Sequence, residues 1–178
     1  METQRIVITG GPGTGKTTLI NALESEGYHI MPEISRDVIL EAQKEGIEQL
    51  FLAKPLLFSE KLLEGRLSQY KEAPSNSMVL YDRGMPDVNA YMDYLGTPYP
   101  THFDHTCREH RYDQVFILPP WKEIYVQDNE RYESFDQAQR IYQYLIKGYE
   151  KYGYEPSEVP IDTVDIRLQF IKDRCPPR

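Results

Sequence analysis

Short apolar runs alternate along this chain with longer segments in which apolar residues recur every three or four positions. The short runs show little alternation of polar and apolar residues, which is typical of parallel strands buried on both faces. They predict five strands, the last of them the weakest, at residues 5–9, 29–31, 78–81, 115–118 and 159–161.

The longer segments have the spacing of helices with one buried face. After Pro55, which suits the first turn of a helix, Leu63, Leu67 and Tyr70 follow one another at four- and three-residue steps. This periodicity predicts helices at residues 15–26, 35–44, 55–71, 135–152 and 164–172.

Strands that alternate with helices indicate an α/β fold, with a parallel sheet covered by helices on both faces. The chain has 178 residues, of which 40% are hydrophobic, and this is enough for one domain with a buried core. We therefore expect a single domain over residues 1–174 and a short tail over residues 175–178.

The segment between the first strand and the first helix, Gly10 to Thr18, matches the pattern G-x-x-x-x-G-K-[ST] at every fixed position. Its glycines let several backbone N–H groups converge on one anion, and the helix that begins there adds its N-terminal dipole. Lys16 is expected to reach the β and γ phosphates of ATP, and the Thr17 hydroxyl to ligate Mg²⁺. The predicted nucleotide-binding residues are Gly11, Gly13, Thr14, Gly15, Lys16, Thr17 and Thr18.

Acidic residues follow two of the predicted strands. Asp82 ends the third strand, so it is expected beside the phosphate loop, where it would hold Mg²⁺ together with Thr17. Arg83 follows at once and would pair with Asp82 or contact a phosphate. Glu33 follows the second strand and has two interpretations: a catalytic carboxylate near a hydroxyl acceptor, or a helix-start residue favoured by the helix dipole.

The charge and the cysteines narrow the classes of partner. The net charge is −8 and the sequence pI is about 5.1, which argues against nucleic acid. We expect no signal peptide and no membrane span, and two widely separated cysteines suggest no disulfide framework, so a cytoplasmic setting is the default.

The cluster His102, His105, Cys107 and His110 would spread around a helix, so a polar helix is favoured over a metal site.

These motifs together resemble the P-loop small-molecule kinases. Glu33 after strand two and Asp82-Arg83-Gly84 after strand three are similar to the deoxynucleoside kinases, and most of the chain resembles the small AAA-type ATPases grouped with the ribosylnicotinamide kinase domain. The deoxynucleoside kinases carry serine where this chain has Gly84, so one side-chain contact is missing.

The resemblance implies a P-loop three-layer fold whose five-stranded parallel sheet has the phosphate-loop strand at its centre. It implies a helical lid over residues 121–134, in which Arg131 would stabilise charge on the phosphates or pair with neighbouring acids. It also implies that the turn at residues 160–164 lies against the nucleotide base.

The leading functional hypothesis is a kinase that transfers the γ-phosphoryl of ATP to a nucleoside-like or other small metabolite, with Lys16, Glu33, Asp82 and Arg131 as catalytic residues. Arg36, Arg83 and Asp87 would hold the acceptor, and Tyr91 would either stack on it or pack in the core. The alternative is a regulatory nucleotide switch with slow hydrolysis and a protein or lipid partner.

Overall fold

The computed structural model describes residues 2–125 and 134–176. Its strands are β1 (Gln4–Thr9), β2 (His29–Met31), β3 (Met78–Asp82), β4 (Gln114–Ile117) and β5 (Ser157–Glu158). The α-helices are α1 (Lys16–Ser25), α2 (Ser35–Lys44), α3 (Leu50–Ala53), α4 (Pro55–Glu72), α5 (Met85–Leu95), α6 (His102–Glu109), α7 (Phe135–Glu150) and α8 (Val164–Arg174). A short 3-10 helix, η1, covers Lys122–Ile124.

All five strands run parallel in the order β2-β3-β1-β4-β5, so the strand before the phosphate loop is central, and the α/β prediction is confirmed. In the register of β1 with β3, Ile8 pairs with Asp82. On the other side of β1, Thr9 pairs with Ile117 of β4. The carboxyl ends of the three central strands therefore finish together, at the edge where open parallel sheets bind ligands.

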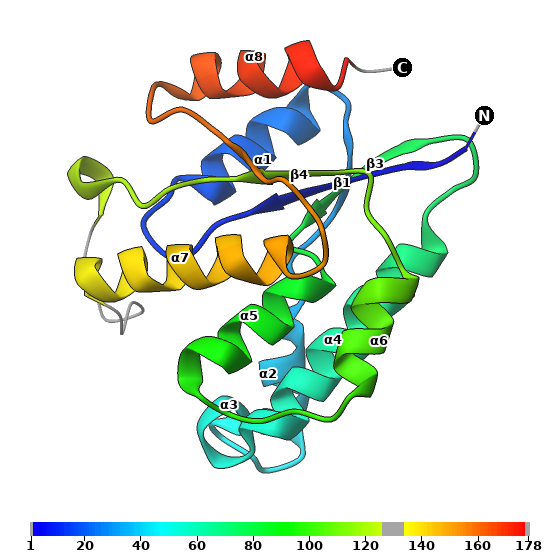
Figure 1. Ribbon diagram of the computed structural model, residues 1–178, viewed down its shortest axis with the longest axis vertical. Coiled ribbons are helices and arrows are strands. Elements are labelled where there is room, and N and C mark those ends of the chain that lie inside the picture. The colour runs from blue at the N-terminus through cyan, green and yellow to red at the C-terminus, as the bar shows by residue number, and fades with distance from the viewer. Residues whose placement is uncertain (1, 126–133, 177–178) are drawn as a thin grey trace.

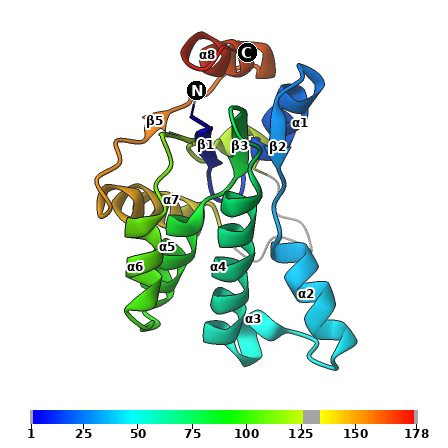
Figure 2. The ribbon, with the colours of Figure 1, turned by 90° about the vertical axis from the view of Figure 1, so that its right-hand side faces the viewer.

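Successive residues of the buried strands point to opposite faces, and each face has its own core. Ile6 and Ile8 of β1 pack with α1 and α8, whereas Val7 packs with residues of α4, α5 and α7. Figures 1 and 2 show the result, with α1 and α8 on one side of the sheet and α4, α5, α6 and α7 on the other. This is the three-layer arrangement that the sequence predicts.

Several segments differ from the prediction, among them the short helices α3 and η1, which were not predicted. The fifth strand lies at Ser157–Glu158, before the predicted residues 159–161, and just after it the Val159 amide donates to the Ile117 carbonyl at 2.9 Å. Helix α5 was not predicted. Seven of its eleven residues are buried, including Asp87 and Asn89, so the polar positions that would reveal a helical period do not lie on an exposed face.

The residue that follows α8 belongs to the core. Cys175, at the start of the predicted tail, is fully buried, and its carbonyl accepts a hydrogen bond of 2.7 Å from the Tyr28 hydroxyl. Within the part of the chain that the structure describes, no helix combines the length and apolar character needed to cross a bilayer.

Candidate functional site

The phosphate loop has the backbone conformation that its glycines were expected to supply. Gly13 and Gly15 have φ values of +70° and +75°, in the left-handed region that favours glycine. A Cβ atom at Gly13 would lie 2.1 Å from the Tyr125 ring, so this position also excludes a side chain by contact. Both glycines are therefore needed for the loop to close.

Carbonyl groups of the loop accept hydrogen bonds from other groups of the protein. The Gly11 carbonyl accepts from the Thr14 hydroxyl at 3.1 Å, and the Gly13 carbonyl accepts from the Trp121 amide at 2.8 Å. The Thr14 carbonyl accepts from Nη1 of Arg167 at 2.7 Å. Bonds to the carbonyls fix the loop from outside and leave its amides available for an anion.

In contrast to those carbonyls, the amides at the start of α1 have no backbone hydrogen-bond partner among the described residues. The Leu19 amide donates to the Gly15 carbonyl at 3.2 Å, and among the described residues no backbone acceptor serves the amides of residues 16–18. Of the side chains that the structure describes, none caps this helix end. Uncapped N–H groups and the positive end of the dipole fit a phosphate, so this segment suits a nucleotide.

Lys16 and Asp82 meet at the carboxyl edge of the sheet. The Lys16 ammonium contacts Oδ1 of Asp82, and both side chains are nearly buried. Burial lowers the pKa of Lys16, and nearby Arg83 acts in the same direction, whereas Asp82 opposes the shift. The structure thus places the two most specific sequence-predicted residues in contact.

The residues predicted to bind Mg²⁺ suit an ion held mainly by waters and substrate phosphates, and they do not form a site built from protein ligands alone. Across residues 2–125 and 134–176, no three His, Cys, Asp or Glu side chains gather as metal ligands. Mg²⁺ usually keeps several waters and takes one or two carboxylates plus substrate phosphates. Thr17, exposed on the first turn of α1, and Asp82 supply the hydroxyl and carboxylate for that mode.

Glu33 lies between two arginines. Its Oε2 is 2.8 Å from Nε of Arg83, and its Oε1 is 3.3 Å from Nη2 of Arg66 and accepts from the amides of Ile34 and Ser35 at 3.0 Å. Burial raises the pKa of Glu33, but Arg66, Arg83 and the Ser35 amide outweigh it and bring the pKa to about 2. The group is a fixed carboxylate rather than a strong base.

Arg83 has an uncommon backbone. Its φ is +73°, and its amide donates to the Ile8 carbonyl at 3.0 Å, which ties the turn after β3 to the central strand. Non-glycine residues in this region are rare and gather at functional sites. The conformation directs the guanidinium to Glu33 and to the Tyr91 hydroxyl, which it meets at 3.2 Å.

Asp87 was predicted to hold the acceptor, but in the structure its carboxylate is bonded to other groups of the protein. It is fully buried, and its carboxylate accepts hydrogen bonds from the Thr9 hydroxyl, the Tyr149 hydroxyl and, at 2.9 Å, the Gly84 amide. These bonds join the end of β1, the start of α5 and α7. Direct contact with an acceptor stays a prediction, while the observed contacts give Asp87 a positioning role.

The same cluster explains why the chain has glycine at position 84. A Cβ atom there would lie 2.8 Å from the Tyr149 hydroxyl and 3.0 Å from Val7 and Tyr112. A serine at this position would therefore displace the Tyr149 hydroxyl from its bond to Asp87.

Sequence reasoning missed two buried arginines. Arg66, 4% exposed, also donates to the Gly84 carbonyl at 3.1 Å, and Arg167, 3% exposed, bonds to the phosphate loop and to the Pro160 carbonyl at 2.9 Å. A signal for Arg66 was present, because it lies three residues after Leu63 and four before Tyr70, on the predicted apolar face of α4.

A cavity of about 550 Å³ opens beside this charged cluster. Arg83, Asp87 and Tyr91 line it, as does Tyr94, whereas Arg36 is exposed on α2 and is not among the described residues of its wall. Arg131, predicted to act from the lid, lies outside the described residues.

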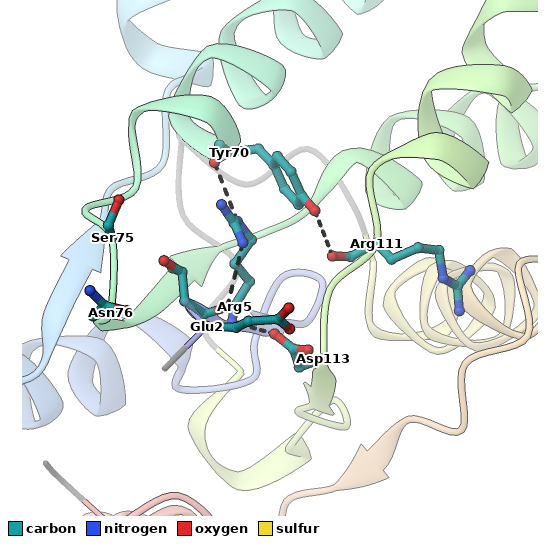
Figure 3. Close-up of a pocket in the computed structure, with 8 residues that line it drawn as sticks. Glu2, Arg5, Tyr70, Ser75, Asn76, Arg111 and Asp113 are labelled. Atoms are coloured by element: carbon teal, nitrogen blue, oxygen red, sulfur yellow. Dashed lines mark hydrogen bonds between the residues drawn. The ribbon is translucent and has the colours of Figure 1, made fainter.

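A second cavity, of about 480 Å³, lies at the opposite end of the sheet (Figure 3). Its charged groups are engaged locally: the Arg5 guanidinium donates to the Tyr70 carbonyl at 3.3 Å and stacks over the Tyr70 ring, and Asp113 accepts from the Arg5 amide at 2.7 Å. Because this cavity lies at the amino ends of the strands, we place the candidate site at the carboxyl edge instead.

Solved structures of two other proteins show the same fold. Deoxyadenosine kinase from M. mycoides, solved with dCMP and a flexible dCDP, matches with a TM-score of 0.70 and 17% identity over 96% of this chain and 98% of that one. The same enzyme with dATP matches with a TM-score of 0.68 and 17% identity, over 96% and 98% of the two chains. NadR in complex with NR matches with a TM-score of 0.71 and 14% identity over 96% of this chain, which spans about half of NadR, 50% of that chain.

The family comparison agrees with the fold. Among proteins of curated function, none matches the sequence significantly. The sequence pattern of the family described as AAA domain matches residues 5–167, which include the phosphate loop, Glu33, Asp82 and Arg167. The chain therefore belongs to the AAA domain family.

Proposed function

We propose that this protein is a Mg²⁺-dependent kinase that transfers the γ-phosphoryl of ATP to a hydroxyl of a nucleoside-like or other small metabolite. One observation carries the proposal. Lys16 pairs with Asp82 at the phosphate loop, and the next residue, Arg83, pairs with Glu33 and lines a cavity large enough for a small molecule. A nucleotide site and an acceptor site would then share one edge of the sheet.

The loop residues would bind the polyphosphate and orient it. The amides of residues 11–18 would cradle the phosphates, and Lys16 would shift from Asp82 to the β and γ phosphates. Magnesium would neutralise charge on the same phosphates, held by Thr17 and by the Asp82 carboxylate that Lys16 releases. The contact between Lys16 and Asp82 supports this exchange, since both groups are already at the loop.

Glu33 would orient the acceptor hydroxyl. In a loose phosphoryl-transfer transition state the bond to the leaving ADP oxygen is largely broken before the acceptor oxygen bonds to phosphorus. The acceptor proton is then lost late, so a carboxylate with a pKa of about 2 can accept a hydrogen bond from the hydroxyl without first removing its proton. Arg83 lies between Glu33 and Tyr91, where it would also stabilise the negative charge of the phosphoryl group during transfer.

Relatives of the same fold support the acceptor class. The M. mycoides enzyme is named deoxyadenosine kinase and was solved with deoxynucleotides, and NadR was solved with NR. Each name or title points to a nucleoside or nucleotide bound on this fold, and on this basis we include nucleosides among the acceptors to be tested.

The test is ATP consumption measured with a panel of nucleosides, ribosylated metabolites and other small alcohols, each with and without Mg²⁺. The proposal predicts that at least one compound accelerates ATP consumption and appears as its phosphate ester, and that Lys16→Ala abolishes both. Hydrolysis that no compound alters would contradict a kinase and favour the regulatory nucleotide switch.

A further inference from the structure

The walls of the cavity beside Glu33 change from charged to apolar along two helices. Helix α5 begins at the sheet, where Asp87 and Val88 line the cavity, and Tyr91, Met92 and Leu95 line it further along. From Asp87 to Leu95 the helix rises roughly 12 Å. The charged end of this wall is therefore the end nearest the phosphate loop.

Helix α4 repeats the same gradient and packs against α5. Arg66 lines the charged end, fixed there by its bond of 3.1 Å to the Gly84 carbonyl. Moving back along α4 and away from the sheet, Leu62, Phe58 and Pro55 line the wall. Figure 2 shows both helices extending away from the sheet on the same side, with α3 at their far end.

Polar groups in the apolar part of the cavity are few. The Ser59 hydroxyl donates to the Met92 sulfur at 2.9 Å and is 7% exposed, so it is already paired. Gln49 and Ser35 are the other uncharged polar wall residues apart from the tyrosines, and Gln49 lies at the exposed start of α3. A ligand whose far end carries many hydrogen-bonding atoms would leave several of them buried without partners, at a cost for each.

Two leucines join Gln49 in the exposed part of the wall. Leu52 of α3 and Leu95 of α5 are 66% and 60% exposed, and both line the cavity. Leu40 of α2 is a further exposed leucine, at 48%, and is not part of the wall. Two exposed leucines at one opening favour a ligand whose apolar end reaches the mouth.

Resting on the kinase function proposed above, we propose that the phosphoryl acceptor is an alcohol with an extended apolar body. Its hydroxyl lies at the Glu33–Arg83 end, and its hydrocarbon portion runs along α4 and α5 to Leu52 and Leu95. In the reaction, the alcohol oxygen bonds to the γ phosphorus, the bond from that phosphorus to the β-bridging oxygen breaks, and the hydroxyl proton passes to solvent. The products are ADP and an alkyl phosphate.

The experiment compares two acceptor sets with Mg²⁺ and ATP: unbranched primary alcohols from butanol to dodecanol, and a panel of nucleosides with ribosylnicotinamide. Alkyl phosphates and nucleotides are identified by mass spectrometry. The proposal predicts that kcat/KM rises about fourfold for each added methylene until the chain reaches the mouth.

Leu52→Asp supplies the structural test, with Leu40→Asp as its matched control. Leu52→Asp should lower kcat/KM at least tenfold for the longest accepted alcohol and little for the shortest, whereas Leu40→Asp should change neither. Leu95→Asp serves as the second mouth variant, and thermal unfolding of each variant checks the fold.

Different results would contradict the apolar acceptor and the kinase function. Phosphorylation of nucleosides but not of alcohols would overturn the apolar acceptor and leave the kinase function standing. So would equal effects of Leu52→Asp and Leu40→Asp on every alcohol. Absence of any phosphorylated product from both sets would overturn the kinase function, and the apolar acceptor with it.

Discussion

At the scale of single residues, the site is organised by one carboxylate held between two arginines, one of them buried. Glu33 contacts both Arg66 and Arg83, and two backbone amides donate to it as well. Glu33 lies two residues before α2, and the amide it accepts from at Ser35 is the first of that helix, as the helix-start interpretation expects. Its catalytic role stays a prediction.

Replacement of Glu33 by Gln should lower turnover sharply and leave Mg²⁺·ATP binding unchanged, because the proposed role of Glu33 concerns the acceptor hydroxyl and not the phosphates. The measurements are steady-state kinetics with the best acceptor and calorimetric titration with ATP. Glu45→Gln, at an exposed position just after α2, is the control. An equal loss of turnover and ATP affinity in Glu33→Gln would show that the residue only supports the structure.

The Glu33 carboxylate should also shape the stability of the protein in acid. Its pKa is lowered from the ordinary 4.5 to about 2, so its interactions contribute full stability above pH 4.5 and are lost as the pH falls towards 2. Between pH 4.5 and 3, the free energy of unfolding of the wild type should therefore fall more steeply than that of Glu33→Gln. Parallel curves from chemical denaturation would contradict the lowered pKa.

At the scale of elements, the phosphate loop is held by parts of the chain far from it in sequence. Arg167 of α8 joins the Thr14 carbonyl to the Pro160 carbonyl, and the Arg167 guanidinium lies 5.6 Å from the centre of the Trp121 ring. The Trp121 amide in turn bonds to the Gly13 carbonyl. The loop after β4 and the last helix thus support the nucleotide site from outside.

Arg167→Met should lower the free energy of unfolding by about 2–3 kcal/mol, because it removes two hydrogen bonds donated by a charged group and leaves the carbonyl of the buried Thr14 without this donor. Mg²⁺·ATP affinity should fall with it, since the loop loses a support. Arg174→Met, on the exposed end of the same helix, is the control and should change little. Unchanged ATP affinity in Arg167→Met would mean that the loop holds its shape without this bond.

The sequence anticipates the elements that follow simple periodicity and the site residues that follow strands. The phosphate loop, Asp82 and Glu33 belong to this group, because a strand end fixes where its next residue lies. Helix α5 and Arg167 could not be predicted in this way. Helix α5 is buried on most of its surface. The contacts of Arg167 with Thr14 and Pro160 depend on how α8 packs across α1. The central position of β1 was an implication of family resemblance, not of the apolar pattern.

At the scale of the whole molecule, the order of the strands assembles the site. Strands β2, β3 and β1 are neighbours, so Glu33, Asp82 and the phosphate loop, which follow these strands, all lie at the same edge. The cavity of about 550 Å³ is lined by residues of α2, α3, α4 and α5, which lie below that edge in Figure 2, and α1 with α8 covers the opposite face. Under the proposed function, this one edge would serve a nucleotide on one side and an acceptor on the other.

The most direct measurement of this arrangement is calorimetric titration of Mg²⁺·ATP into the wild type and Lys16→Ala. The account predicts saturable binding by the wild type and no measurable binding by the variant, which should keep its far-ultraviolet circular dichroism. Lys172→Ala, which removes a lysine paired with Glu26 on the surface, should bind ATP as the wild type does. Equal ATP affinity of the wild type and Lys16→Ala would contradict the nucleotide site on which every other inference depends.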